Sequence, residues 1–336
     1  MLCVLTAFSS CQNDDWEFPD FDYTTVYFAY QYPVRTITLG EDNLYDTSLD
    51  NEHKCKIMAT TGGGYTNKSN ITIDIEVKND LCDNLLFKAS GHAVTPMPSN
   101  YYSLASNKIV ISKGEIVGGI EVQLTDAFFA DPDAVKNTYV IPVSMIQAQN
   151  VDSVLRGTPK FAGANRCIAD EWDVLPQDFI LYAVKYINSW HASYLRRGKD
   201  VVTGKNGDTS IDKTVIRHAA YVEKDEVCKM TTSSMTQVIF SPDIKDKNGT
   251  DISCDLILTF DDTGKCSVTT DSKDFTATGA GTFVKRGDKK SWGNEDRDVI
   301  YLNYDMEFSD MKYTSTDTLV VRSRDVVMET FSTVLK

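Results

Sequence analysis

The chain has 336 residues, a formal net charge of −14 and a pI of about 4.7. Single hydrophobic cores rarely grow beyond ~250–300 residues, so this length predicts two domains. The strong negative charge would repel a phosphate backbone, and nucleic acid is therefore excluded as an expected partner.

The N-terminus has the pattern of a lipoprotein signal peptide. An apolar stretch ends in two serines and Cys11, and polar and acidic residues follow at once from Gln12 to Asp15. Secretory signals carry such a stretch with small residues before the cleavage site. The usual basic residues are missing, because no Lys or Arg precedes Cys11. We predict a signal over residues 1–11 with Cys11 as the lipid site; the alternative is a disordered N-terminus with an incidental cysteine.

Lipidation of Cys11 would be enough to hold the protein at a membrane. Two acyl chains give stable attachment at ~0.8 kcal/mol per buried methylene, and no later run reaches the ~18 consecutive apolar residues of a transmembrane helix. The acidic segment after the cysteine resembles the surface-export signal of Bacteroidales outer-membrane lipoproteins. We expect an outer-membrane lipoprotein exposed at the cell surface, in contact with the membrane only through its lipid anchor, with residues 12–22 as a tether.

Residues 23–161 have the pattern of a β-sandwich. Ile71, Ile73, Ile75 and Val77 alternate with polar residues, as in a strand with one buried face. Several short strands at this spacing are typical of a sandwich. Further strands are predicted at 25–30, 109–111, 120–124 and 139–143, and one helical turn at 131–135.

Residues 162–171 lose the alternation and are predicted to be a linker to a second domain at 172–336. About eight strands are expected in this domain. The clearest is at 300–308, where Ile300, Leu302 and Tyr304 share one face. This number of strands without a long helix favours a small antiparallel barrel. Glycines at 278–281 predict a barrel bend or a close approach of two strands.

Both domains resemble known families of Bacteroidales surface proteins. The segments 35–40, 101–104 and 138–143 and the turn 113–115 look like an immunoglobulin-like (Ig-like) domain of unknown function found in front of surface endoglycosidases. The order of Trp190-His191, Tyr194 to Gly198 and Asp317 to Val320 is similar to a lipocalin-like C-terminal domain of unknown function that partners it. The resemblance implies an all-β protein, an Ig-like β-sandwich followed by a lipocalin-like antiparallel β-barrel, and supplies no catalytic residues.

The cysteines and histidines do not predict a metal site. None of the cysteines forms a C-x-x-C pair, and the four histidines lack ligand spacing. No metal and no cofactor is expected. If Phe260 faces Lys265 across a turn, Cys254 and Cys266 lie beyond disulfide reach and are free thiols. The disulfide state of four others stays open: Cys55, Cys82, Cys167 and Cys228.

The sequence gives little support for a catalytic site. Gly62 to Ser69 comes close to a phosphate-binding loop, but such a loop must open a helix. The strand predicted at 71–77 follows instead, which favours a hairpin tip. No G-x-S-x-G motif occurs, and the carboxylate pair of a glycosidase cannot be recognised without a fold.

The candidate ligand-binding residues are mostly aromatic. Trp292 lies among polar residues between two strands, where an exposed ring often serves as a platform for a sugar; the alternative is a tryptophan that caps the barrel end. Trp190 and Tyr194 also fit a barrel-core cluster with His191. Arg196, with Arg197, fits a barrel mouth or a solvated turn. The full set is Trp292, Asn294, Trp190, Tyr194 and Arg196.

We expect a non-catalytic glycan-binding lipoprotein of a polysaccharide-utilisation system. The barrel would recognise a glycan or oligosaccharide through aromatic stacking and hydrogen bonds. Two alternatives remain: a glycoside hydrolase with two carboxylates at the barrel end, and a structural subunit that docks onto an outer-membrane uptake complex. A lipocalin-like barrel also leaves room for a small apolar ligand.

Overall fold

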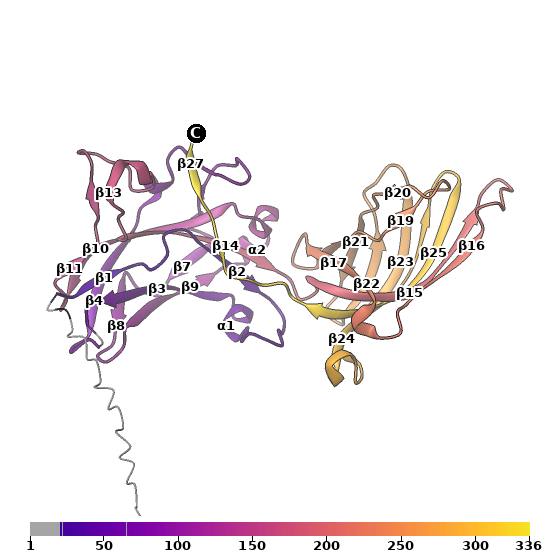
Figure 1. Ribbon diagram of the computed structural model, residues 1–336, viewed down its shortest axis with the longest axis horizontal. Helices are drawn as coiled ribbons and strands as arrows, with labels where there is room; N and C mark the ends of the chain where they lie inside the picture. Colours follow the sequence, from indigo (N-terminus) through magenta and orange to yellow (C-terminus); the bar gives the residue numbers. More distant parts are fainter. Residues whose placement is uncertain (1–20, 22, 65) are drawn as a thin grey trace, which may run out of the picture.

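The computed structural model describes residues 21, 23–64 and 66–336. The predicted signal at 1–11, with Cys11, lies outside the described residues. Figure 1 shows a sheet-rich body and a barrel arranged end to end. Secondary structure is nearly all β, as the sequence predicts. Within the described ranges, no helix is long and apolar enough to cross a membrane.

The first domain is a sandwich of two sheets that enclose a core of alternating residues such as Ile57, Ile73 and Val122. One sheet has the order β11 (Ser153–Val154), β1 (Thr25–Tyr27), β3 (Lys54–Gly62), β9 (Val117–Leu124) and β7 (Tyr102–Leu104). The other has the order β26 (Glu329–Thr330), β2 (Pro33–Thr38), β14 (Phe179–Ile187), β10 (Tyr139–Gln149), β4 (Ile71–Val77) and β8 (Lys108–Ile111), with β6 (Thr95–Pro96) beside β10. Smaller elements are α1 (Ser48–Asn51), α2 (Asp126–Phe129), η1 (Asn79–Cys82), η2 (Pro132–Val135), β5 (Leu85–Phe87), and the ribbon of β12 (Thr158–Pro159) and β13 (Trp172–Val174) with η3 (Ala169–Glu171) before it.

The strand β14 belongs to the sandwich and not to the barrel. It pairs antiparallel with β10 and parallel with β2. Alternate residues of β14 enter the cores on its two faces, with Tyr182 and Val184 on one side and Leu181 and Ala183 on the other. The domain boundary predicted at 162–171 is therefore wrong, and the chain leaves the sandwich only at Asn188. A strand that is covered on both faces has a continuous apolar run, and such a run does not indicate which strands pair with it.

The second domain is an antiparallel barrel. Its strands are β15 (Ala192–Gly204), β17 (Glu226–Thr232), β18 (Gln237–Phe240), β21 (Leu256–Phe260), β22 (Lys265–Thr269), β23 (Thr276–Asp288), β24 (Arg297–Glu307) and β25 (Met311–Ser323). Pairing of β25 with β15 closes the ring. The remaining elements are β16 (Lys213–Arg217) beside β15, the ribbon of β19 (Ile244–Lys245) and β20 (Asp251–Ile252), and the short helices η4 (Val222–Lys224) and η5 (Trp292–Asn294).

Close packing of the barrel depends on glycines in β23. A Cβ at Gly279 would lie 2.5 Å from the carbonyl oxygen of Asn303, and one at Gly281 would lie 2.3 Å from Leu302. The predicted close approach at these glycines is therefore confirmed. The predicted register of the β21–β22 turn is wrong by one residue, since Phe260 pairs with Cys266.

The prediction for the Gly62–Ser69 segment is wrong. The segment connects β3 in one sheet to β4 in the other, so it is a crossover between sheets and not the predicted hairpin tip. Cys254 and Cys266 are free and buried, as predicted. The four cysteines left open by the sequence are free and buried as well: Cys55, Cys82, Cys167 and Cys228.

After the barrel, the chain returns to the sandwich. Residues 324–336, here called the C-terminal strap, run back along the first domain (Figure 1). In this strap β26 pairs with β2, and β27 (Thr333–Leu335) pairs with β5. Lys185 in β14 also binds Glu329 of the strap at 2.8 Å. Two segments of chain therefore connect the domains, residues 188–191 and the start of the strap.

Candidate functional site: the cleft at the domain junction

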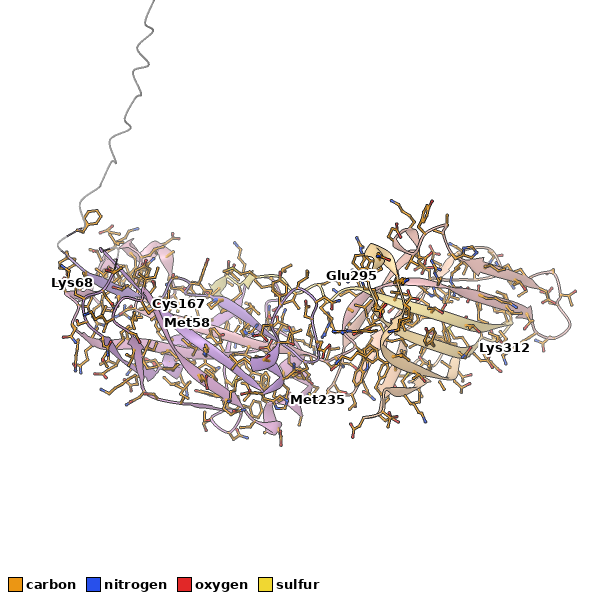
Figure 2. All side chains as sticks on the ribbon, turned by 90° about the horizontal axis from the view of Figure 1, so that it is seen from below. Met58, Lys68, Cys167, Met235, Glu295 and Lys312 are labelled. Atoms are coloured by element: carbon orange, nitrogen blue, oxygen red, sulfur yellow. The ribbon has the colours of Figure 1, made fainter. Side chains whose placement is uncertain are left out.

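The junction between the domains is held by buried polar side chains. Asn188 is 1% exposed, and its side-chain amide donates to the carbonyl oxygens of Ser234 and Gln237 in the barrel, both at 2.8 Å. Met235, in the same barrel loop, packs against the sandwich core and lies at the junction in Figure 2. These contacts fix the position of the barrel relative to the sandwich.

Arg324 is the second element of the junction. Its guanidinium is buried and donates four hydrogen bonds to backbone carbonyl oxygens, those of Leu39 and Glu41 in the sandwich and those of Asn188 and His191 in the connection. The side chain thereby fixes the loop that follows β2.

A cleft of about 440 Å³ opens at this junction. One wall is the loop after β2 and the other is the outer surface of the barrel, from β23, η5, β24 and the end of β25. Its volume is within the range of small-ligand sites, which often lie between domains. The cleft is lined by Gly40, Glu41, Asp42, Asn43, Leu44, Ser189, Phe283, Lys285, Arg286, Trp292, Glu295, Arg297, Asp298, Val321, Arg322, Ser323 and Arg324.

Trp292 lines the cleft, but it is not a fully exposed platform. The ring is half-buried and covers a small apolar cluster on the outer barrel wall. Its Nε1 donates to the carbonyl oxygen of Val321 at 3.2 Å, and the guanidinium of Arg297 lies 3.7 Å from the ring centroid. A cation over an indole face is a favourable contact. Trp292 therefore presents a ring that is already stacked on Arg297 and fixed in orientation.

The carboxylates of the cleft are all engaged with neighbouring groups. Glu41 forms an ion pair with Lys285 across the cleft, and Glu295 accepts from Arg297 at 2.8 Å. Asp42 accepts from the backbone of Leu44, and Asp298 from that of Arg286, both at 2.7 Å. The hydrogen bond from Lys285 holds the pKa of Glu41 below its usual value. A general acid needs the opposite shift, so Glu41 is not prepared for that role.

Two cations of the cleft remain available to a ligand. Arg286 and Arg322 are exposed, and within the described part of the chain neither forms an ion pair. Guanidinium groups bind oxygen atoms with a planar array of donors. Both arginines line the cleft together with Trp292.

The structure does not bring the other predicted residues into the cleft. Asn294 is exposed on η5 next to Trp292 but does not line the cavity. Trp190 stacks on Phe260 with ring centroids 4.2 Å apart, and Tyr194 is fully buried and donates to the carbonyl oxygen of Trp190 at 2.7 Å. These two residues form the barrel-core cluster that the sequence also allowed.

Arg196 is inside the barrel and is neither at a mouth nor in a solvated turn. Its predicted turn position is wrong because β15 continues through Arg196-Arg197-Gly198 as one long strand. The guanidinium is 1% exposed and contacts Asp317 at 3.1 Å, Glu226 at 3.0 Å and the Tyr304 hydroxyl at 3.2 Å. A buried charge is tolerated only with such partners.

This cluster occupies part of the barrel interior with charged and polar side chains. Arg217 pairs with both Asp200 and Asp317, and Ser315 donates to Asp200 at 2.6 Å. Gly198 is required beside it, because a Cβ there would lie 2.1 Å from the carbonyl oxygen of Thr316. The arrangement disfavours a small apolar ligand in this region. In the described residues, no group of three metal-ligating side chains is gathered.

Of the candidate residues indicated by the sequence, Trp292 lines the cleft, whereas no residue of the opposite wall was among them. The loop at 40–44 and Arg324 have no local pattern that links them, since Glu41 and Arg324 are 283 positions apart. The glycine at position 40 could have indicated a turn there, and the structure shows such a turn with a φ of +87° at Gly40.

The fold and the cleft define a two-domain β protein, a sandwich joined to a barrel with a ligand-sized cleft between them. A family model described as a domain of unknown function (DUF5627) matches residues 189–325, and a model described as an N-terminal domain matches residues 21–152. The first match begins where the barrel begins and ends at the strap. The comparison with curated proteins gives no match.

One solved structure is similar over nearly the whole chain. A Bacteroides ovatus protein of unknown function, solved at 2.40 Å resolution, is 45% identical with a TM-score of 0.89, over 94% of this chain and 100% of that chain. The protein belongs to the same family as this Bacteroides ovatus protein.

Two further solved structures were compared. One, from Bacteroides ovatus, is described as a candidate carbohydrate binding protein; it is 10% identical with a TM-score of 0.27, over 90% of this chain and 98% of that chain. A two-domain protein of unknown function from Bacteroides fragilis is 10% identical with a TM-score of 0.32, over 93% and 92% of the two chains. Both scores are too low to carry an argument about this chain.

Proposed function

We propose that this protein is a non-catalytic glycan-binding lipoprotein of the outer cell surface, anchored through Cys11, and that glycan binds in the cleft at the domain junction. The observation that carries the proposal is the position of Trp292. Its ring is held by Arg297 at the edge of a ligand-sized cleft that also contains the exposed Arg286 and Arg322. Apolar walls with a few directed polar groups are typical of small-ligand sites.

The same cleft favours binding over hydrolysis. A glycoside hydrolase needs one carboxyl group with a raised pKa as acid and a second carboxylate as base or nucleophile. The pKa of Glu41 is lowered by Lys285, and Glu295 is paired with Arg297. The role in a polysaccharide-utilisation system, in contact with an outer-membrane uptake complex, is part of the proposal and rests on the lipid site and the family resemblance.

The experiment is calorimetric titration of the chain from Gln12 onward with a panel of neutral and acidic plant and host oligosaccharides. Arg286→Gln combined with Arg322→Gln changes two exposed side chains and should leave the fold intact. We expect this variant to weaken binding by about tenfold or more, and Arg297→Ala to do the same by releasing Trp292.

Lys312→Gln is the matched control. Figure 2 shows that Glu295 of the cleft lies next to the domain junction, whereas Lys312 lies on the barrel far from that junction. This variant should bind as the parent protein does. The proposal is wrong if no glycan of the panel binds, or if the cleft variants bind every ligand unchanged.

A further inference from the structure

A second cavity lies on the sandwich, on the other side of the loop that borders the junction cleft. Its volume is about 480 Å³. Residues of β2, of the 42–47 loop and of the strap line it, and Asp42 lines both cavities. The strap also borders both, with Arg324 at the junction cleft and residues 326–328 at the second cavity. The two cavities are therefore neighbours along the surface.

The rim of the second cavity is unusually apolar for an exposed loop. Tyr45 is 58% exposed, and Val327 and Met328 from the strap are 66% and 69% exposed. Grouped exposed apolar side chains often mark a binding site. An exposed tyrosine ring offers a face for the C–H groups of a sugar and a hydroxyl for its oxygens. Unlike the ring of Trp292, the ring of Tyr45 is open to solvent.

The floor of the cavity is polar and nearly buried. Asp50, which is 2% exposed, accepts from the backbone N–H of Thr38 at 2.9 Å and forms an ion pair with Arg35. The side chain of Arg35 is 34% exposed and lines the cavity, and its guanidinium also donates to the carbonyl oxygen of Thr36 at 2.9 Å. Such a pair combines fixed donors and acceptors, the combination that binds vicinal hydroxyl groups.

Thr38 is a further nearly buried residue of the cavity lining. The residue is 3% exposed, and its hydroxyl oxygen has no hydrogen-bond partner within the described residues. This oxygen is itself shielded from solvent, so Thr38 shapes the cavity without offering a hydrogen bond to a ligand.

We propose that this cavity, formed by Tyr45, Thr38 and the Arg35–Asp50 pair, is a second sugar subsite that takes one neutral pyranose unit. The unit is neutral because the charges of Arg35 and Asp50 compensate each other, whereas Asp42 and Asp46 on the rim repel an acidic sugar. The proposal shares only its class of ligand with the junction cleft. A glycan that reaches past the 42–47 loop would occupy both cavities at once.

The test uses the chain from Gln12 onward and four simple probes, the methyl glycosides of glucose, galactose, mannose and xylose, at millimolar concentration. Ligand-observed saturation-transfer NMR reports their binding. We expect at least one probe to bind, and Tyr45→Ala to weaken it about tenfold. Tyr45→Phe keeps the ring and should bind within about twofold of the parent protein. Tyr221→Ala, at a tyrosine of the barrel that is 68% exposed, is the matched control and should change nothing.

The outcomes separate this subsite from the junction cleft. If no methyl glycoside binds, or if Tyr45→Ala leaves binding unchanged, the subsite is wrong, even where the Arg286→Gln/Arg322→Gln variant abolishes oligosaccharide binding and supports the cleft. If Tyr45→Ala removes the methyl glycoside signal while the cleft variant changes nothing, the subsite stands and the proposed function of the cleft fails.

Discussion

The guanidinium of Arg324 donates from Nη2 to the backbone carbonyl oxygen of Asn188 at 2.7 Å, and so joins the two segments of chain that run between the domains. The same nitrogen donates to the carbonyl oxygen of Leu39 at 3.0 Å. One side chain of the strap thus contacts both the loop after β2 and the connection to the barrel. The shape of the junction cleft depends on this contact.

Arg324→Ala should therefore destabilise the protein and loosen its junction. Four backbone carbonyl oxygens would lose a donor, and we expect the free energy of unfolding to fall by about 3–5 kcal/mol. Chemical denaturation measures the loss, and small-angle scattering should show a wider range of domain orientations. Arg322→Gln, two residues away and exposed, should stay within about 0.5 kcal/mol. An Arg324→Ala variant as stable as this control would contradict the role of the guanidinium.

The barrel interior should tolerate the loss of Arg196 poorly. Arg196→Met leaves the buried Asp317 without its Nε partner, and the expected cost is about 3–5 kcal/mol because a buried charge is left undercompensated. Adding Asp317→Leu should restore part of that stability, so the double variant should lose less than the two single changes together. Strictly additive losses in denaturation midpoints would show that the two side chains act independently.

His191 should make stability depend on pH. Burial lowers the pKa of His191 to about 4, and its Nδ1 accepts from the backbone N–H of Thr232 at 3.0 Å. The unfolded chain titrates near ~6.5, so between these values the unfolded state binds the proton and the folded state does not. Stability from this group is complete above pH ~6.5 and is lost as the pH falls toward 4, by up to about 3 kcal/mol.

His191→Asn keeps a side-chain acceptor and removes the titration. Unfolding free energies measured for both proteins from neutral to acidic pH should therefore diverge, with the parent protein losing more. Parallel curves would show that His191 does not contribute.

The cysteines should be unreactive in the native protein. Burial raises the pKa of Cys55 and Cys228 to about 12, and that of Cys167 to about 11. Thiolates are the reactive species, so a thiol reagent should label the folded chain from Gln12 onward very slowly. In denaturant all six described cysteines should react. Rapid labelling without denaturant, or a mass lower by two hydrogens, would instead indicate an exposed thiol or a disulfide.

Strands with one buried face were predictable from the sequence. The alternation through Ile300, Leu302 and Tyr304 is borne out by their burial inside the barrel, and Ile71 and Ile73 likewise face the sandwich core. The pattern works here because successive side chains of a strand point to opposite faces. The all-β fold class follows from this signal.

What the sequence could not supply is which strands are neighbours. β14 is apolar on both faces, and a pattern of that kind does not indicate whether the strand belongs to the domain before it or after it. The strap strands are two and three residues long, too short for any periodicity. The wall of the cleft opposite Trp292 depends on Arg324 reaching a loop near the start of the chain, which is a tertiary contact without a local signature.

Because the strap returns to the first domain, the barrel is an insertion in the sequence of that domain and does not simply follow it. The sandwich begins before the barrel and is completed after it, with β26 and β27 as its last strands. A short peptide that joins Asn188 to Arg324 would leave the barrel out of the chain, because the side chain of Arg324 already reaches the backbone of Asn188. During synthesis, the sheets of the first domain can therefore be completed only after residues 329–335 have been made.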